Sequence, residues 1–449
     1  CAYHPKILLK IVLFGYSRGL IGSRQLERAC RENVQFMALT GEAKPDHSTL
    51  AAFISRSPKA IKSVFQEVLL VCHEAGLIGR EHFAIDGVKL PSNASKEWSG
   101  RLDELQAKAA KLDRAIERML ERHQMVDRDD AQDDLQRYAA QQIDKLNQQS
   151  QKIKAFLQQA QPKWGPKGPK GSERKSNVTD NESAKMKTGK GVMQGYTAIA
   201  VTDDKHQIIV EAQAHGVPQE QELLQPVLED LQTHFCDLRL SPNILAEAAL
   251  TADAGFHSGD NLAWLEAQGC DAYVADNLFR KRDPRFAEAE KYKPPKPPSA
   301  HFKPADFRYD PGTVRCTCPA GKTLYRNGTH TQKNGRRGIH FTAPKSACSG
   351  CHLRARCLKS AQQATPRSVV FFTEPADQDS PIERMKAKID SPSGRYRYSR
   401  RIGTVEPPFG NLRYHKRLDR FTLRGREKVE GQWRLYALVH NIEKLAYGA

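Results

Sequence analysis

Five short apolar runs within residues 82–277 are the feature that most restricts the fold of this chain. In order they read HFAIDGVKL, GYTAIAVTD, HQIIVEAQAHG, ILAEAALTADAGF and CDAYVADN. The second and third alternate between polar and apolar residues around Asp203-Asp204-Lys205, which is typical of a β-hairpin. Helical periodicity fills residues 218–235 and 258–269, on either side of the fourth run. This order predicts an α/β fold in which helices flank a mixed sheet.

Three carboxylates stand out against this predicted sheet. Asp86 and Asp253 each lie at the end of an apolar run, and Glu406 lies far along the chain in a basic, helix-like segment. Adjacent strands bring distant residues together, so these side chains can converge. Carboxylates are the ligands that hold two divalent ions for phosphodiester cleavage, and Mg²⁺ suits that chemistry. A strand-ending turn is an equally ordinary place for an Asp that precedes Gly or Ala-Gly.

The charge of the chain predicts a polyanionic partner. Its 70 Lys and Arg residues exceed its 52 Asp and Glu residues by 18. The excess is concentrated, because residues 395–428 hold eleven Lys or Arg and only three acids. Such a surface gains affinity for nucleic acid by releasing counterions, although a generally solvated basic surface has the same composition. No apolar run reaches the roughly 18–20 residues of a membrane span, so no membrane partner is predicted.

The cysteines are concentrated as well. Of the ten in the chain, five lie in one stretch, and they are Cys316, Cys318, Cys348, Cys351 and Cys357. Five thiolates at these spacings offer enough ligands for a tetrahedral zinc site, which needs four. Reduced thiols without a metal are the alternative. The other cysteines are scattered, which fits a reducing cytosol better than a disulfide framework.

Changes in composition divide the chain into six parts. Short amphipathic helices at the start predict a domain that binds DNA, dimerises or simply packs. Heptad-like spacing on both sides of the acidic break DRDDAQDD predicts an antiparallel coiled-coil hairpin, whose role is dimerisation, clamping of DNA or spacing. The parts are 1–78, helical; 79–99, the first strand; 100–176, the hairpin and a basic linker; 177–278, the rest of the sheet; 279–380, an irregular Cys-rich insertion; and 381–449, a helical end with Glu406.

Several blocks of the sequence resemble one protein family. They include AYHPKILLKIVLFGY, EAKPDHSTLAAF, FAIDGVKLPSNASK, NVTDNESAKMKTGKGVMQGYTAIAV, TADAGFHSGDNL, CPAGKTLY with CSGCHLRARCL, and TVEPPFGNLRYHKRLDRFTLRGREKVEGQWRLYALVHNIEKL. The family is that of bacterial insertion-sequence transposases of the DDE type. The resemblance implies an RNase H-like catalytic core, the fold shared with retroviral integrases. It also implies Asp86, Asp253 and Glu406 as catalytic residues and as ligands of two Mg²⁺ or Mn²⁺ ions.

The resemblance extends to residues around these acids. It implies Cys318, Cys348, Cys351 and Cys357 as ligands of a structural zinc ion, with Cys316 as a spare thiol. The family's Tyr-Arg-Glu-Lys signature is matched by Tyr398 and Arg401, one residue further from Glu406 than is commonest. Arg413 stands where that signature often has Lys, and either base can neutralise a phosphate.

Other side chains near the acids are candidates for contacts with the substrate. The basic residues expected to contact DNA are Arg401, Arg413, Lys416 and Arg417. Lys89 and His257 follow the two aspartates by three and four residues, and each either contacts phosphate or a metal-bound water or is a solvated or packing residue. Pro408, soon after Glu406, is expected in the first turn of a helix, where proline is tolerated.

The resemblance implies a DNA transposase in which water attacks the phosphodiester at each element end and the freed 3′-hydroxyl then attacks target DNA. Work on two ends of double-stranded DNA implies at least a homodimer in the synaptic complex. A bacterial cytoplasmic, nucleoid-associated location is expected. The alternatives are an RNase H-like nuclease without strand transfer and a transposase-derived DNA-binding protein without activity. Because the chain begins with Cys1 rather than Met, a missing first part is also expected.

Overall fold

The computed structural model describes residues 3–126, 133–166, 168–189, 191–288, 301–333, 336–358, 365–372 and 379–447. Two compact units emerge from the contacts between residues. Unit 1 comprises Cys1–Phe256, Gln268–Ala272 and Ser399–Ala449, and unit 2 comprises His257–Ala267 and Tyr273–Tyr398. Most of the predicted acidic break DRDDAQDD lies outside the described residues.

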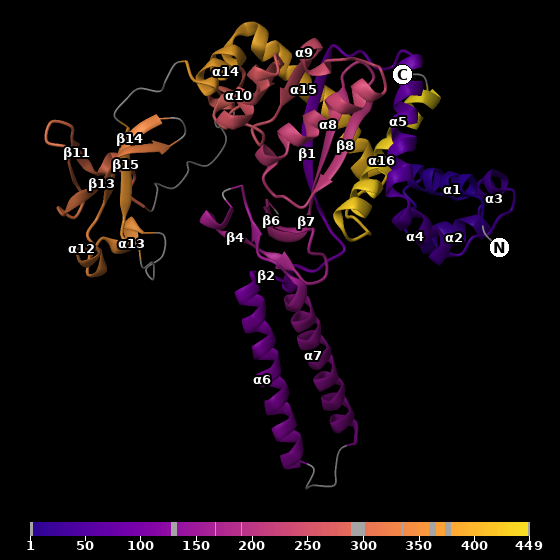
Figure 1. Cartoon of the computed structure of the whole chain (residues 1–449), viewed down its shortest axis with the longest axis horizontal. Coiled ribbons are helices and arrows are strands. Elements are labelled where there is room, and N and C mark those ends of the chain that lie inside the picture. The colour runs from indigo at the N-terminus through magenta and orange to yellow at the C-terminus, as the bar shows by residue number, and fades with distance from the viewer. Residues whose placement is uncertain are drawn as a thin grey trace. The chain divides into compact units, whose positions relative to one another are not determined.

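A mixed sheet with flanking helices forms unit 1 (Figure 1), which confirms the predicted α/β class. β10 begins in this unit and pairs next to β9, and the order is β10–β9–β1–β7–β6, with β8 also paired to β7. β1 runs antiparallel to β7 and parallel to β9. The strands are β1 (His82–Pro91), β6 (Ala184–Thr188), β7 (Gly191–Asp203), β8 (Ile209–His215), β9 (Ala249–Ala252) and β10 (Asp271–Val274).

The predicted hairpin is formed by β7 and β8. All of β8 and most of β7 are buried, as expected for strands that are covered on both faces. The carboxylate of Asp203 accepts hydrogen bonds from the backbone N–H groups of Gly79 (3.0 Å), Arg80 (2.9 Å) and Lys205 (3.0 Å). This one side chain therefore fixes both the hairpin turn and the backbone that leads into β1.

Helices α8 (Leu224–Asp237) and α16 (Arg426–Tyr447) pack on this hairpin. His234 of α8 meets Glu211 of β8 in a buried pair, with 2.5 Å between Nδ1 and Oε2. Trp433 of α16 donates its Nε1–H to the carbonyl of Ile199 at 2.8 Å. The C-terminal helix is therefore an integral layer of the core.

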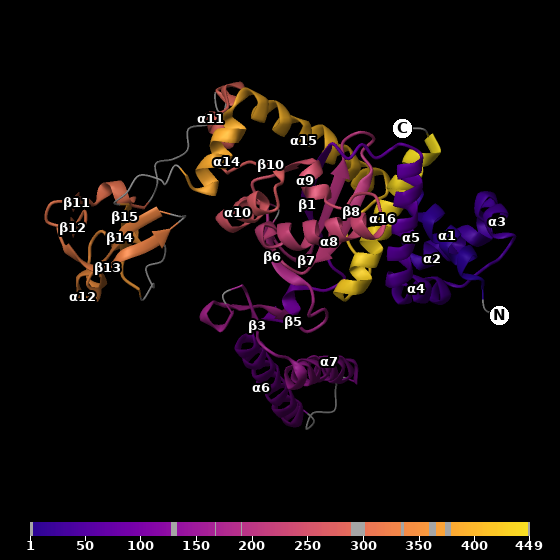
Figure 2. The same cartoon turned by 45° about the horizontal axis from the view of Figure 1, so that its top comes forward.

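Five helices occupy residues 5–74 and join the same core through α16. Tyr16 of the first helix meets Tyr436 of α16 with ring centroids 4.8 Å apart. Figures 1 and 2 show the fifth helix beside α16, although the two are far apart in sequence. The five are α1 (Pro5–Ser17), α2 (Ser23–Glu32), α3 (Val34–Thr40), α4 (His47–Arg56) and α5 (Pro58–Glu74).

Two long helices, α6 (Leu102–Val126) and α7 (Asp133–Gln159), form an arm after β1 (Figure 1). They share an apolar seam near the sheet, and its buried members are Leu105, Ala109 and Ile153. At the base of the arm, β2 (Ser99–Gly100) pairs with β5 (Ser176–Asn177). The chain therefore enters and leaves this insertion at one place.

Unit 2 contains a five-stranded antiparallel sheet, so the prediction of an irregular insertion over residues 279–380 is wrong. Its buried core includes Cys316, Leu324 and Phe341. The sequence pattern does not reveal these strands, because the first two have only three residues each and the third pairs with register shifts. They are β11 (Arg308–Asp310), β12 (Arg315–Thr317), β13 (Thr323–Lys333), β14 (Arg336–Thr342) and β15 (Ser368–Phe372).

Helix α15 (Pro392–Gly410) carries Glu406 and passes through two prolines before a π-helical turn, Asn411–His415. The expectation that Pro408 lies in a first helical turn is therefore wrong, since it lies near the end of α15. A proline frees the carbonyl four residues earlier. For Pro407 that carbonyl belongs to Gly403, and it accepts a hydrogen bond from Gln207 Nε2 at 3.0 Å instead. This outside partner lets the helix continue through the proline pair.

Candidate active site

The parallel pairing of β1 with β9 places two of the predicted catalytic residues on neighbouring strands. Ile85 lies opposite Ala252 in the register, and Asp86 and Asp253 are the residues that follow this pair. Asp253 follows the last residue of β9, whereas Asp86 lies within β1, which continues to Pro91 against β7, so the expectation that Asp86 ends a strand is wrong. The two aspartates lie on neighbouring strands at the point where the β1–β9 pairing ends. The structure thus reproduces the convergence expected of these two aspartates.

Both carboxylate oxygens of Asp86 accept hydrogen bonds from neighbouring groups. Oδ1 accepts the N–H of Gly87 at 2.8 Å, and Oδ2 pairs with Nη1 of Arg401 at 3.0 Å. Burial raises the pKa of the Asp86 carboxyl above its ordinary value, the Arg401 charge opposes that rise, and the Asp253 charge adds to it. The two aspartates therefore lie close enough for their charges to repel.

Glu406 reaches the same region from α15. Its side chain is exposed, and with Asp86 it lines an open pocket of about 550 Å³. The other residues of this pocket are Gly87, Val88, Phe409, Gly410, Arg413, Tyr414 and Asp419. Glu406 therefore faces the space beside Asp86. Nothing in the contacts of the described residues joins Glu406 directly to Asp253.

A fourth acid, Glu220, lies with the two aspartates and was missed by sequence analysis. It begins a short 3₁₀ turn (Glu220–Glu222) after β8, and its Oε1 lies 3.5 Å from Nζ of Lys89. Burial raises the pKa of Glu220, Lys89 opposes the rise, and the charges of Asp253 and Asp86 add to it. Acids are common at the start of a helix, so nothing in the sequence set Glu220 apart.

The remaining candidates have different surroundings. Lys89 pairs with Glu220, as described above. His257 belongs to unit 2, where burial lowers the pKa of its imidazole and the charge of Asp276 opposes that effect. Tyr398 also belongs to unit 2 and packs on Phe279, with 4.9 Å between ring centroids.

The four basic residues predicted to contact DNA divide into two kinds. Arg413 and Arg417 are exposed, and Arg413 lines the pocket of Asp86 and Glu406. Arg401 is only 13% exposed because it faces Asp86. Lys416 is buried, where its ammonium pairs with Glu443 and donates to the carbonyl of Ser17. The structure therefore presents two of the four at the surface and uses the other two internally.

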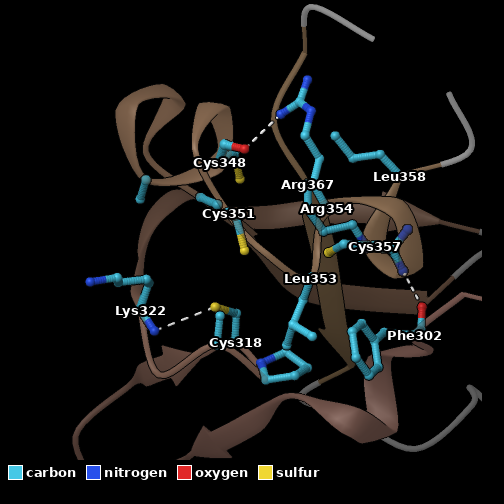
Figure 3. Close-up of a pocket in the computed structure, with 14 residues that line it drawn as sticks. Phe302, Cys318, Lys322, Cys348, Cys351, Leu353, Arg354, Cys357, Leu358 and Arg367 are labelled. Atoms are coloured by element: carbon cyan, nitrogen blue, oxygen red, sulfur yellow. Dashed lines mark hydrogen bonds between the residues drawn. The ribbon is translucent and has the colours of Figure 1, made fainter. Parts of the chain in front are cut away.

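Four predicted zinc ligands lie around one small pocket in unit 2, with a volume of about 30 Å³. Figure 3 shows the side chains of Cys318, Cys348, Cys351 and Cys357 turned toward the same space. The sulfur of Cys318 accepts the backbone N–H of Lys322 at 3.4 Å. Burial raises the pKa of the Cys357 thiol, Arg367 opposes the rise, and the other three cysteines add to it.

Cys316, the predicted spare thiol, has a different position. It is fully buried in the core of the five-stranded sheet, opposite Leu324 in the register of β12 and β13. It does not line the pocket of the other four cysteines. All nine cysteines within the described ranges are free of disulfide bonds.

The carboxylates around Asp86 and the four cysteines of unit 2 both offer donor atoms suited to cations. In neither group are these atoms assembled into a coordination sphere. Carboxylate oxygens are hard ligands of the kind that Mg²⁺ prefers, and four thiols are a complete zinc set. In the part of the chain that the structure describes, no three His, Cys, Asp or Glu side chains are arranged to hold a metal ion.

Two aspartates on neighbouring strands and a glutamate on a nearby helix are the kind of carboxylates that a phosphoryl-transfer site uses to hold divalent ions. A family model for a transposase DDE domain matches residues 317–446, and one for a transposase domain (DUF772) matches residues 1–56. These matches support an insertion-sequence transposase of the DDE type. Glu406 lies within the first match, whereas Asp86 and Asp253 lie between the two.

No curated protein matches the chain. The described helices include none with the length and apolar character needed to cross a membrane.

Proposed function

We propose that this transposase cleaves and joins DNA with Asp86, Asp253 and Glu406 as its catalytic carboxylates. The observation that carries the proposal is the β1–β9 register, which brings Asp86 and Asp253 to neighbouring positions where that pairing ends, with Asp86 in the pocket of Glu406. Mg²⁺ or Mn²⁺ ions held by these carboxylates supply activation of the attacking oxygen and stabilisation of the leaving oxygen.

The residues around the pocket have distinct tasks in this reaction. Arg401 holds the Asp86 carboxylate in place, and Arg413 offers an exposed guanidinium to a phosphate. In the first step a water oxygen bonds to phosphorus and the bond to the 3′-oxygen breaks, which leaves a 3′-hydroxyl on the element end. That hydroxyl then attacks a target phosphodiester and displaces a 3′-oxygen of the target.

An RNase H-like core is the fold that we propose for unit 1. Its support is a sheet whose earliest strand, β1, lies between an antiparallel neighbour, β7, and a parallel one, β9. For the arm we propose the predicted coiled coil, which is supported by the apolar seam between α6 and α7. Because the reaction acts on two element ends, we also propose a homodimer in the synaptic complex.

A structural zinc ion held by Cys318, Cys348, Cys351 and Cys357 is proposed for unit 2. The four thiols around one pocket support it, as does the burial of Cys316 elsewhere. Elemental analysis of reduced protein should give about one zinc per chain, and Cys351→Ser should remove it. Cys316→Ser is the matched control and should keep the metal. Wild-type protein without zinc would contradict the proposal.

The test of the function is cleavage of DNA that carries the element's terminal repeats, with Mg²⁺ or Mn²⁺. Wild type, Glu406→Ala and the exposed control Glu427→Ala should be compared. Nicking at the ends followed by joining, lost only in Glu406→Ala, is the expected result. Nicking without joining would favour an RNase H-like nuclease, and binding without cleavage in wild type would favour an inactive DNA-binding protein.

A further inference from the structure

Gly255, two residues after Asp253, lies directly against the carboxylate of Glu220. A Cβ atom placed on Gly255 would lie 2.0 Å from Oε2 of Glu220 and 3.0 Å from Oδ1 of Asp253. These two carboxylate oxygens are therefore no more than 5.0 Å apart, the sum of the two distances. The carboxylate of Glu220 fills the space that any larger residue at this position would need.

The charges around this point favour an added cation. Asp86, Asp253 and Glu220 influence one another through their charges, and the described ion pairs supply Arg401 to Asp86 and Lys89 to Glu220. Three carboxylates against two cations leave a net negative charge. The carboxylate of Asp253 accepts the N–H of Gly255 at 2.9 Å. A divalent cation beside it would offset the repulsion between the acids.

We infer that Glu220 is a fourth carboxylate of the active site and that it shares a divalent cation with Asp253. The inference rests on the proposed function, because the cation is one of those that the DNA-cleaving site would bind. Octahedral coordination at 2.0–2.1 Å requires two adjacent ligand oxygens to lie roughly 3 Å apart. The present separation is at most 5.0 Å, so binding of the cation requires only a rotation of the side chains to bring the two oxygens to that distance.

Lys89 is the counter-ion of Glu220 in the absence of the cation. Their separation of 3.5 Å is long for a hydrogen-bonded pair, and the two side chains are 28% and 16% exposed. Such a contact can be exchanged for a metal ion at little cost. The ammonium that is released then lies beside the site, where a phosphate group of DNA would be its new partner.

The experiment is a titration of the full-length protein with Mn²⁺, followed by electron paramagnetic resonance of the free ion. Glu220→Gln should weaken binding at least tenfold, and Glu220→Asp should weaken it less. The matched control is Glu222→Gln in the same 3₁₀ turn, where the native side chain pairs with Arg174 at 2.6 Å. That control should bind Mn²⁺ as wild type does.

The variant Lys89→Met tests whether Glu220 is a ligand of the cation or only the partner of Lys89 in an ion pair. If Glu220 binds the ion, this variant keeps or strengthens Mn²⁺ binding, because it releases the carboxylate. If Glu220 serves only to pair with Lys89, both variants bind Mn²⁺ as wild type does, and the inference is overturned. Asp253→Asn tests the proposed function separately, since unchanged Mn²⁺ binding in that variant would exclude the catalytic metal site itself. Thermal unfolding of each variant shows whether it is folded.

Discussion

Arg401 donates Nη1 to Oδ2 of Asp86 at 3.0 Å and thereby connects α15 to β1 across 315 positions of sequence. The guanidinium is 13% exposed and faces the carboxylate rather than the solvent. The helix that carries Glu406 is therefore fixed to the strand that carries Asp86, the first of the proposed catalytic aspartates. This contact gives Arg401 a positioning role in the proposed site.

Replacing Arg401 should impair cleavage more than binding. Arg401→Gln leaves Asp86 without its cation, so we expect cleavage to fall about 10- to 100-fold, as for other residues that orient a metal ligand. DNA affinity, measured by fluorescence anisotropy, should change by less than about twofold. Arg400→Gln is the control, because its native side chain pairs with Asp204 and is 45% exposed. A large loss of DNA affinity in Arg401→Gln would instead make it a DNA contact.

Arg413 should behave as a phosphate contact. It is exposed in the pocket of Asp86 and Glu406, so Arg413→Gln should weaken DNA binding uniformly across sequences. The slope of log affinity against log salt should fall by about 1, because one fewer counterion is released. Lys416→Gln is a useful contrast, since its native ammonium pairs internally with Glu443. That variant should lose stability and keep the salt slope.

Gly255→Ala should disturb the site through Glu220. The new methyl group would overlap Oε2 of Glu220, the end of a flexible side chain, so the carboxylate should turn aside and the loss in the free energy of unfolding should stay below about 1 kcal/mol. Removing the obstructing carboxylate in the double variant Gly255→Ala, Glu220→Ala should recover much of that loss. Urea denaturation of the two single variants and the double variant measures the coupling, and simple additivity would show that the two residues do not meet.

His440 should make the protein less stable in acid. Burial lowers the pKa of its imidazole from 6.5 to about 4, and its ring nitrogens contact the Gln207 carbonyl at 2.8 Å and the Asn411 amide at 3.1 Å. The unfolded chain therefore binds the proton more tightly, so stability falls as the pH drops below the unfolded value. Between pH 7 and pH 5 this residue should cost about 2 kcal/mol.

Denaturation of wild type and His440→Gln at the two pH values measures that contribution. The variant should lose about 2 kcal/mol less than wild type on acidification, whatever its stability at pH 7. Equal losses in the two proteins would mean that His440 is not buried in its neutral form.

The sequence could single out Asp86 and Asp253 as candidates because each follows an apolar run and lies in a block that resembles the family, and the structure places them on neighbouring strands. The sequence could not find Glu220, whose place at a helix start is ordinary, since its proximity to Asp253 depends on the path of the chain after β8. The sheet of unit 2 escaped prediction because its shortest strands are three residues long. The expected position of Pro408 was wrong because α15 already begins at Pro392. Gln207, distant in sequence, accommodates the neighbouring Pro407 by bonding to the Gly403 carbonyl.

The two-residue pairing of β2 with β5 brings together the two ends of the insertion that contains α6 and α7. The two ends of the insertion lie side by side, with Ser99 opposite Asn177 and Gly100 opposite Ser176. Relatives could therefore gain or lose whole heptads, in pairs on the two helices, without altering the register of β1. The length of the arm can thus change while Asp86 and Asp253 keep their positions on the neighbouring strands.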